Sequence, residues 1–313
     1  MPFTAKSGKF NTSINTVEIG CGEKAIKLGG EHVFPFYSFD AQIEHAPKVG
    51  IEITDLGMED EPECIKKYYE GCSTMVDIAK KAAAVAGADF LSFCMAGGDP
   101  GGANKSTEEL LEVLTEISTA VDLPLVISGS GHVLKDTELL PQVAAVLTGK
   151  NAVILAVQEE NYKTVGTAAG LTHQQVVGAE SAIDINLAKQ LNVLLHKLGV
   201  DSKTIVMNLG SASAGYGFEY LVSTMERVKI AALSQDDINL QMPVITPVAS
   251  EVWSVKEATA PEADMPEWGN QEERGIYMEI ETAAAALASG ANAVILKHPV
   301  SVATIKRLIT ELI

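Results

Sequence analysis

The glycine-rich segment CMAGGDPGGANKST, residues 94–107, has the composition of a phosphate-binding loop but not its spacing. A Walker loop needs a lysine directly after its last glycine, so that backbone N–H groups and the ammonium meet the phosphates together. Here two residues separate Gly102 from Lys105. The dinucleotide pattern G-x-G-x-x-G does not fit either, because Asp99 and Pro100 interrupt the glycines. The segment therefore does not predict a nucleotide site.

Several side chains that could act as acids, bases or nucleophiles follow apolar runs. Lys297 follows the last such run, where a lysine either forms a Schiff base, as in aldolases, or pairs with a carboxylate. His132 follows SGSG without a second histidine or carboxylate at metal-ligand spacing, which favours a hydrogen-bonded loop histidine. Glu159 and Glu160 are adjacent, so we expect their side chains to diverge and not to work as a carboxylate pair.

The hydroxyl and amide side chains near these positions lack the context of a catalytic group. Ser128 and Ser130 do not stand in the G-x-S-x-G turn of a hydrolase nucleophile. Asn161, Asn208 and Tyr216 have groups that could hydrogen-bond a flat heterocycle or an amide-bearing ligand, or that could cap helices and loops. No constellation in the sequence therefore amounts to an active site.

The composition excludes some classes of partner. The formal charge is −18, from 41 acidic and 23 basic residues, so no basic stripe is available for a nucleic acid. Apolar residues make up 47% of the chain, but no run approaches the roughly 18 that a membrane helix needs. The start, MPFTAKSGKF, lacks the apolar region of a signal peptide, so we expect a cytoplasmic protein.

The cysteines predict reduced thiols and no metal centre. The chain has four cysteines, with no C-x-x-C pair and no cysteine–histidine cluster of zinc spacing. An iron–sulfur cluster normally takes four well-placed thiolates. We therefore expect no such cluster in this chain alone.

Eight short apolar runs, each followed by a helical pattern, predict the elements that must position these residues. The runs are VGIEITD, ADFLSFC, LPLVISG, NAVILAV, QQVVGAE, TIVMNLG, MPVITPV and NAVILKH. The alternation is typical of parallel βα units, and eight is the number of strands in a (β/α)8 TIM barrel. We predict an α/β fold with this barrel over residues 49–313. Residues 1–48 contain NTVEIG and KAIKLGG, which predict a hairpin-like extension over the barrel bottom or one side.

Helix-capping signals support the barrel. Ser106 and Glu109 form a capping-box pattern, and Asp184 and Gly199 bracket a second amphipathic segment. The clearest insertion, residues 249–275 between the seventh strand and its helix, is acidic and holds both tryptophans. It is either a surface lid anchored by two indoles or a docking surface.

The expected mouth of the barrel is built from small residues. Ligand-binding residues of such barrels gather at the C-terminal ends of the strands. The loops expected there, including MAGGDPGG, SGSGH, GAESAID and NLGSASAGYG, are dominated by glycine, alanine and serine. Such residues let the backbone approach a broad ligand or another protein closely. The glycines of residues 97–102 either thin one rim of this mouth or form a tight turn without a ligand.

Four segments together resemble one known family. They are VQEENYKTVG, GAESAIDINLAKQLNVLL, TIVMNLGSASAGYGFEYLVSTMERVKIAAL and MPVIT, and the most specific pieces are residues 184–191 and 215–227. From about Val49 to its C-terminus, the chain resembles the small subunit of the corrinoid iron–sulfur protein of the acetyl-CoA (Wood–Ljungdahl) pathway. That family is related to the delta subunit of archaeal acetyl-CoA decarbonylase/synthase.

The resemblance implies a methyl-carrier subunit that is not itself catalytic. A larger partner subunit would carry a [4Fe–4S] cluster and a cobamide-binding domain, with the cobamide between that subunit and this barrel's mouth. The cobalt would accept a methyl group from a methyltetrahydrofolate:corrinoid methyltransferase and pass it to acetyl-CoA synthase. Because D-x-H-x-x-G is absent, this chain should not hold the cofactor alone. The residues expected along the cobamide are Gly97, Gly98, Asp99, Ser128, Ser130, His132, Asn161, Asn208, Ser211 and Tyr216.

Two other functions stay open from the residues alone. A free-standing pterin-dependent methyltransferase uses a similar barrel and would want carboxylates and amides converging on the pterin at several strand ends. Asn208 qualifies, but the third strand ends in Ser128 and Gly129 without an acid. A Schiff-base aldolase would use Lys297 and would be exposed by borohydride trapping.

Overall fold

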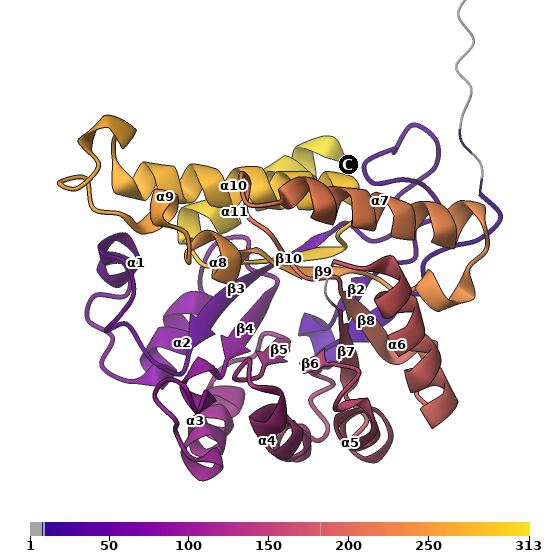
Figure 1. The fold of residues 1–313 in the computed structure, drawn as a ribbon, viewed down its shortest axis with the longest axis horizontal. Coiled ribbons are helices and arrows are strands. Elements are labelled where there is room, and N and C mark those ends of the chain that lie inside the picture. Colours follow the sequence, from indigo (N-terminus) through magenta and orange to yellow (C-terminus); the bar gives the residue numbers. More distant parts are fainter. Residues whose placement is uncertain (1–7, 9, 182) are drawn as a thin grey trace, which may run out of the picture.

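The computed structural model describes residues 8, 10–181 and 183–313 (Figure 1). The expected extension over residues 1–48 therefore lies partly outside the described residues. Each apolar run predicted as a strand forms one. The eight strands of the main sheet are β3 (Lys48–Thr54), β4 (Phe90–Cys94), β5 (Leu125–Ser128), β6 (Val153–Val157), β7 (Val176–Glu180), β8 (Ile205–Asn208), β9 (Ile245–Pro247) and β10 (Ala293–Leu296).

The eight strands form a parallel ring. Their order is β8-β7-β6-β5-β4-β3-β10-β9, and each hydrogen-bonded pair is parallel. An isolated parallel bridge between Met207 and Val244 joins the two ends of this order. The predicted (β/α)8 TIM barrel is confirmed. Near-continuous apolar runs suit it, because strands of a parallel barrel are buried on both faces.

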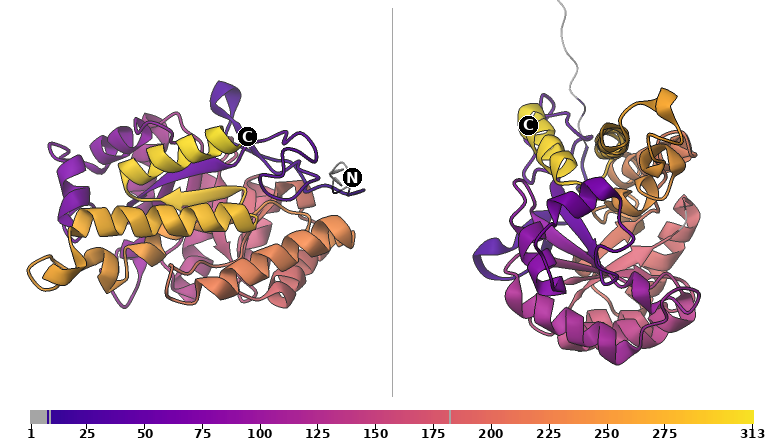
Figure 2. Two further views of the ribbon diagram at one scale, coloured as in Figure 1. Left: turned by 90° about the horizontal axis from the view of Figure 1, so that it is seen from above. Right: turned by 90° about the vertical axis from the view of Figure 1, so that its left-hand side faces the viewer.

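Helices surround the strands, as both views in Figure 2 show. They are α1 (Glu63–Tyr68), α2 (Met75–Ala83), α3 (Thr107–Ala120), α4 (Val133–Val146), α5 (Tyr162–Gly166), α6 (Ile185–Leu198), α7 (Phe218–Ser234), α8 (Val248–Val252), α9 (Lys256–Thr259), α10 (Gln271–Ser289) and α11 (Pro299–Leu312). A π-helical turn, Thr167–Thr172, continues α5. Within the described ranges, no helix combines the length and apolar character needed to cross a bilayer.

The predicted capping signals are used. Ser106 Oγ accepts a hydrogen bond from Glu109 N at 3.2 Å, and Glu109 Oε2 accepts one from Ser106 N at 2.8 Å, which completes the capping box of α3. Asp184 Oδ1 accepts from Asn186 N at 2.7 Å at the start of α6. Gly199 ends α6 with φ of 106°, a left-handed conformation that favours glycine.

A short hairpin closes the bottom of the barrel. Strands β1 (Val17–Ile19) and β2 (Ile26–Leu28) pair antiparallel. Val17, Ile19 and Leu28 are buried in one apolar cluster with residues near the starts of the barrel strands, among them Phe90 and Val126. The end of the barrel where the strands begin is therefore closed by apolar side chains.

Gly50→Ala tests the packing inside the barrel. A Cβ at Gly50 would lie 2.1 Å from Cε2 of the buried Phe90 ring on the neighbouring strand. Overpacking of this kind costs about 1–3 kcal/mol, and we expect urea unfolding to show that loss. The double variant Gly50→Ala/Phe90→Leu should recover part of it, and Gly102→Ala, whose Cβ would meet nothing closer than 3.7 Å, should be neutral. An unchanged midpoint for the single variant would contradict the packing.

Candidate functional site

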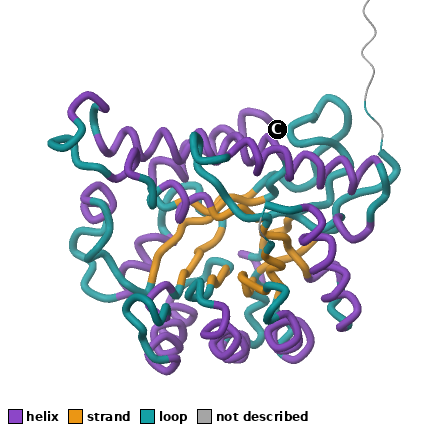
Figure 3. The backbone as a smooth tube through the Cα atoms, viewed as in Figure 1, coloured by secondary structure: helices purple, strands orange, loops and turns teal. Residues whose placement is uncertain are grey.

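The mouth of the barrel comprises the C-terminal ends of the strands and the loops that follow them, which Figure 3 traces in teal. It has two parts with different chemistry. One is an open hollow beside β6 to β9, here called the acidic hollow. The other is a buried group of side chains beside β3, β4 and β10, here called the carboxyl cluster.

The acidic hollow has a volume of about 710 Å³. Four carboxylates line it, those of Glu159, Glu160, Glu180 and Glu251, and its described lining includes no lysine or arginine. Burial raises the pKa of Glu251 above its usual value. The hollow is therefore an acceptor-rich surface, suited to a ligand that presents N–H donors or positive charge.

Glu180 lies at the end of β7, between two amide side chains. Its Oε1 accepts from Gln158 Nε2 at 2.6 Å, and its Oε2 accepts from Asn208 Nδ2 at 2.9 Å. Asn208 Oδ1 in turn accepts from Gly210 N at 3.0 Å. Three neighbouring strand ends thus hold one carboxylate and two amides in a fixed arrangement.

Two serine hydroxyls in the lining of the hollow have no partner among the residues that the structure describes. Ser181 Oγ and Ser211 Oγ are buried, and neither makes a hydrogen bond within the described part of the chain. Buried polar groups in folded proteins are nearly always paired, with protein atoms, water or a ligand. Of the residues predicted from the sequence, Ser211 and Asn208 line this hollow.

The carboxyl cluster begins with Lys297, directly after β10. Its Nζ lies 2.7 and 3.0 Å from the two carboxylate oxygens of Glu61. Burial alone would lower the pKa of the Lys297 ammonium, but the charges of Glu61 and Glu52 raise it above its usual value. A lysine held as an ammonium is not a Schiff-base nucleophile. The expected pairing of Lys297 with a carboxylate is confirmed.

Glu279, on α10, anchors this side of the mouth. Its carboxylate accepts from Trp253 Nε1 at 3.0 Å, Lys297 N at 2.6 Å and His298 N at 3.1 Å. Trp253 is buried and stacks on the His298 ring at a centroid separation of 6.1 Å. Trp268 is half-buried, so the two indoles of the insertion have different environments.

Glu52, inside β3, completes the cluster. It is 6% exposed and lies opposite Ser92 of β4 in the strand register. In the part of the chain that the structure describes, its carboxyl receives no hydrogen bond, and its neighbours act on it through charge alone. Burial, opposed by Lys297 and reinforced by Glu61, raises the pKa of Glu52 to about 7.

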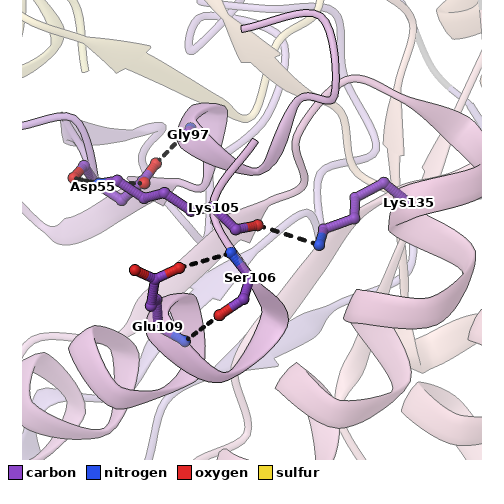
Figure 4. Close-up of polar contacts among 6 residues, drawn as sticks. All are labelled: Asp55, Gly97, Lys105, Ser106, Glu109 and Lys135. Atoms are coloured by element: carbon purple, nitrogen blue, oxygen red, sulfur yellow. Dashed lines mark hydrogen bonds and ion pairs between the residues drawn. The ribbon is translucent and has the colours of Figure 1, made fainter. Parts of the chain in front are cut away.

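The glycine-rich segment after β4 packs tightly against the chain itself (Figure 4). Gly97 N donates to Asp55 Oδ1 at 2.8 Å, and Asp55 Oδ2 lies 3.0 Å from Lys105 Nζ. A Cβ at Gly97 would lie 2.1 Å from Asp55 Oδ2, and one at Gly98 would lie 2.9 Å from Leu110 Cδ1. Close packing therefore accounts for both glycines, Gly97 against the buried Asp55 and Gly98 against Leu110 of α3, and contact of either with a cobamide stays a prediction.

Two other predicted site residues hydrogen-bond to residues that follow them closely in sequence. Asp99 Oδ1 accepts from Gly101 N at 2.9 Å. Ser130 Oγ donates to Asp136 Oδ1 at 2.7 Å, and Ser128 is half-buried at the end of β5.

The last three candidates lie in different surroundings. His132 is exposed and caps α4, its Nδ1 accepting from Lys135 N at 3.3 Å. Asn161 is buried, and its Oδ1 accepts from Gln158 N at 2.8 Å. Tyr216 is exposed, and its hydroxyl donates to Glu257 Oε2 at 2.5 Å. Their expected role beside a cofactor also stays a prediction.

Sequence reasoning did not single out Glu52, Glu180 or Gln158. Each stands in or directly after an apolar strand, in VGIEITD, QQVVGAE and NAVILAVQ. A carboxylate inside a run that is buried on both faces is costly unless it is compensated or protonated. That signal could have identified Glu52 and Glu180 as candidate functional residues. Within the described ranges, no three His, Cys, Asp or Glu side chains are grouped so that they could hold a metal ion.

Comparisons with known proteins show the family to which this chain belongs. The model of the CO dehydrogenase/acetyl-CoA synthase delta subunit family matches residues 16–296. The acetyl-CoA decarbonylase/synthase complex subunit delta of Archaeoglobus fulgidus is 30% identical over 302 residues, covering 94% of this chain and 65% of that protein. The corresponding subunit of Methanocaldococcus jannaschii is 30% identical over 287 residues, covering 91% and 69%. This chain spans about two thirds of the length of these relatives.

Solved structures with a similar fold include dihydropteroate synthases. The enzyme of Xanthomonas albilineans with 4-aminobenzoic acid superposes with a TM-score of 0.58 at 14% identity, covering 95% of this chain and 97% of that one. The enzyme of Thermus thermophilus gives 0.56 at 11% identity, covering 95% and 100%. At such low identity the likeness concerns the fold alone.

Proposed function

Since this chain belongs to the CO dehydrogenase/acetyl-CoA synthase delta subunit family, we propose that its barrel mouth receives a cobamide held by a larger partner subunit. Its relatives are named as subunits of the acetyl-CoA decarbonylase/synthase complex. In the proposed role, the pair of subunits carries a methyl group from a methyltetrahydrofolate:corrinoid methyltransferase to acetyl-CoA synthase. The partner subunit, and not this chain, holds the [4Fe–4S] cluster.

The observation that carries this proposal is the unpartnered Ser181 and Ser211 hydroxyls in a hollow lined by carboxylates. A corrin ring is wide and flat, and its edge bears amide groups. Carboxylates accept hydrogen bonds from amide N–H groups, and serine hydroxyls donate to amide carbonyls. The donor and acceptor set of the hollow therefore fits such an edge.

The residues of this chain would orient the ligand and exclude water. When bound, the cobalt of the cobamide supplies the nucleophile that takes up the methyl group. Glu180, Gln158 and Asn208 are already held by one another, so they can receive ligand amides with little rearrangement. Lys297 and Glu61 neutralise each other on the β3 and β10 side of the mouth, and the ammonium is not a free nucleophile.

Ser211→Leu tests the proposal. The larger side chain fills part of the hollow and removes an unpartnered hydroxyl, so we expect the corrinoid-bearing partner to bind about tenfold more weakly, or about 1.4 kcal/mol. Ser223→Leu, on the exposed side of α7, is the matched control and should bind normally. Binding is measured by anaerobic titration, following corrinoid absorbance. Equal affinity of the Ser211 variant and wild type would refute the proposed site.

A second candidate function is binding of a pterin by this chain alone. The observation in its favour is the Glu180 carboxylate flanked by Gln158 and Asn208 at three strand ends. However, the third strand ends in Ser128 and Gly129, which bring no carboxylate to the mouth. Calorimetry of the isolated chain with methyltetrahydrofolate distinguishes the two functions: tight binding would favour the methyltransferase, and none would favour the carrier.

A further inference from the structure

The carboxyl cluster holds more negative groups than positive ones. The Lys297 ammonium pairs with Glu61 and interacts through charge with Glu52, whereas Glu279 accepts from the backbone N–H of Lys297. The charges of Lys297, Glu61 and Glu279 all act on Glu52. Cys94, on the neighbouring strand, is a further titratable group, and burial together with the nearby Glu52 raises the pKa of its thiol. Three carboxylates and one ammonium in a buried site cannot all stay ionised without large cost. One carboxyl must therefore keep its proton near neutral pH.

The hydrogen bonds decide which carboxyl that is. Both carboxylate oxygens of Glu61 accept hydrogen bonds from Lys297 Nζ, which favours the ionised form of Glu61. Glu279 is fully buried, which raises its pKa, but it accepts from three N–H groups that cannot accept a proton in return. Glu52 has neither a salt-bridge partner of its own nor a hydrogen-bond donor within the described residues. The proton therefore belongs on Glu52.

We propose that Glu52 is a proton-binding site of the barrel mouth, which keeps its proton at neutral pH and exchanges it with water when charge changes above it. Arrival of positive charge breaks the Glu52 O–H bond, and the proton leaves to water while the electron pair stays on the carboxylate. Arrival of negative charge keeps the O–H bond intact. The ligand class is an electron-rich metal macrocycle whose charge changes in use. This part rests on the proposed function; the proton site itself does not.

Glu52 has a buried hydroxyl beside it and an open hollow near it. It lies on the inner face of β3, opposite the Ser92 hydroxyl, which is buried without a partner within the described residues. Directly above, Thr54 and Lys297 line a second hollow of about 390 Å³, which connects this side of the mouth to solvent. Glu52 itself does not line this hollow; it stands two residues before Thr54 on the same strand, and its charge partners Glu61 and Lys297 do line it.

Infrared spectroscopy of the full chain tests the proton site without any cofactor. The spectrum of wild type minus that of Glu52→Gln should contain one carboxylic-acid C=O band at pH 6, which disappears by about pH 9. Glu180→Gln, on the opposite side of the mouth, is the matched control and should leave that band in place. Absence of the band at pH 6 would overturn the proposal.

A second variant keeps the test independent of how well Glu52→Gln folds. Glu61→Gln frees the Lys297 ammonium to act on Glu52, so the midpoint of the same band should move down by about one pH unit or more. An unchanged or higher midpoint would overturn the assignment of the proton to Glu52.

Proton uptake on reduction of the bound corrinoid tests whether Glu52 responds to the charge of the ligand. The oxidised corrinoid brings positive charge that drives the proton off Glu52, and reduction removes that charge. Reduction in the wild-type complex should therefore take up more protons, by up to one per chain, than reduction of the Glu52→Gln complex, as measured with a pH indicator in weak buffer. Equal uptake would refute the coupling. Failure of the chain to capture any corrinoid-bearing partner would instead refute the proposed function, while the infrared result would still stand.

Discussion

Glu52→Gln is expected to gain about 2.5 kcal/mol of stability over wild type as pH rises from 5 to 9. The native pKa of Glu52 is raised from 4.5 to about 7, mainly by burial. Below about 4.5 the carboxyl is protonated in both the native and the unfolded chain. Between these values unfolding releases a proton, so wild-type stability falls as pH rises, and above the native pKa the full cost of the buried charge is present.

The measurement is the free energy of unfolding in urea for both proteins across pH 5 to 9. A glutamine cannot titrate, so the difference between the two curves should grow up to about pH 7 and then level off. Any constant cost of burying the amide cancels in that comparison. Glu160→Gln, at an exposed position, is the control and should give no such pH dependence. A difference that stays flat across the range would show that Glu52 is already ionised at pH 5.

Lys229→Met is expected to cost about 3–5 kcal/mol of stability. Lys229, on α7, is buried, and its Nζ lies 2.6 Å from Glu31 Oε1 and 3.0 Å from Asn292 Oδ1. Burial raises the pKa of Glu31, but Lys229 and Asn292 together lower it below its usual value. Without the ammonium, a buried carboxylate would be left uncompensated, and the segment before the barrel would lose its anchor to α7.

Urea unfolding at pH 7 measures this effect. The double variant Lys229→Met/Glu31→Gln removes both charges and should recover most of the loss, because a neutral pair needs no counter-ion. Lys203→Met, at an exposed position, should change little. Since the native pKa of Glu31 is lowered, the contribution of the pair is present above pH 4.5 and is lost as pH falls through the native value. Equal stability of the single and double variants would contradict this account.

The barrel could be predicted because its signals are local. Each strand is a short apolar run, and the caps at Ser106 and Asp184 depend on residues three or fewer positions away. The environments of the two tryptophans in the insertion could not be predicted, because the sequence around them does not distinguish a buried indole from an exposed one. Trp253 is buried against Glu279, whereas Trp268 lies beneath Lys256 and Arg274 at the surface.

The mouth could not be predicted, because its contacts join distant parts of the chain. Lys297 reaches Glu61 across 236 residues, through the pairing of β10 with β3. Glu180 meets Asn208 and Gln158 only because β6, β7 and β8 are neighbours in the ring. Glu52 is hidden in an apolar run, and its proton depends on a count of charges that only the closed barrel brings together. The small-residue loops indicated the character of the mouth, but not its carboxylates.

Anaerobic co-purification with the larger subunit tests the carrier role most directly. The tagged chain is expressed together with that subunit, and the eluate is assayed for subunit ratio, corrinoid absorbance and iron. We expect an equimolar complex that contains corrinoid and iron, both of which stay with the partner when the subunits are separated. A colourless chain that elutes alone, binds methyltetrahydrofolate and moves its methyl group to added corrinoid would contradict the account.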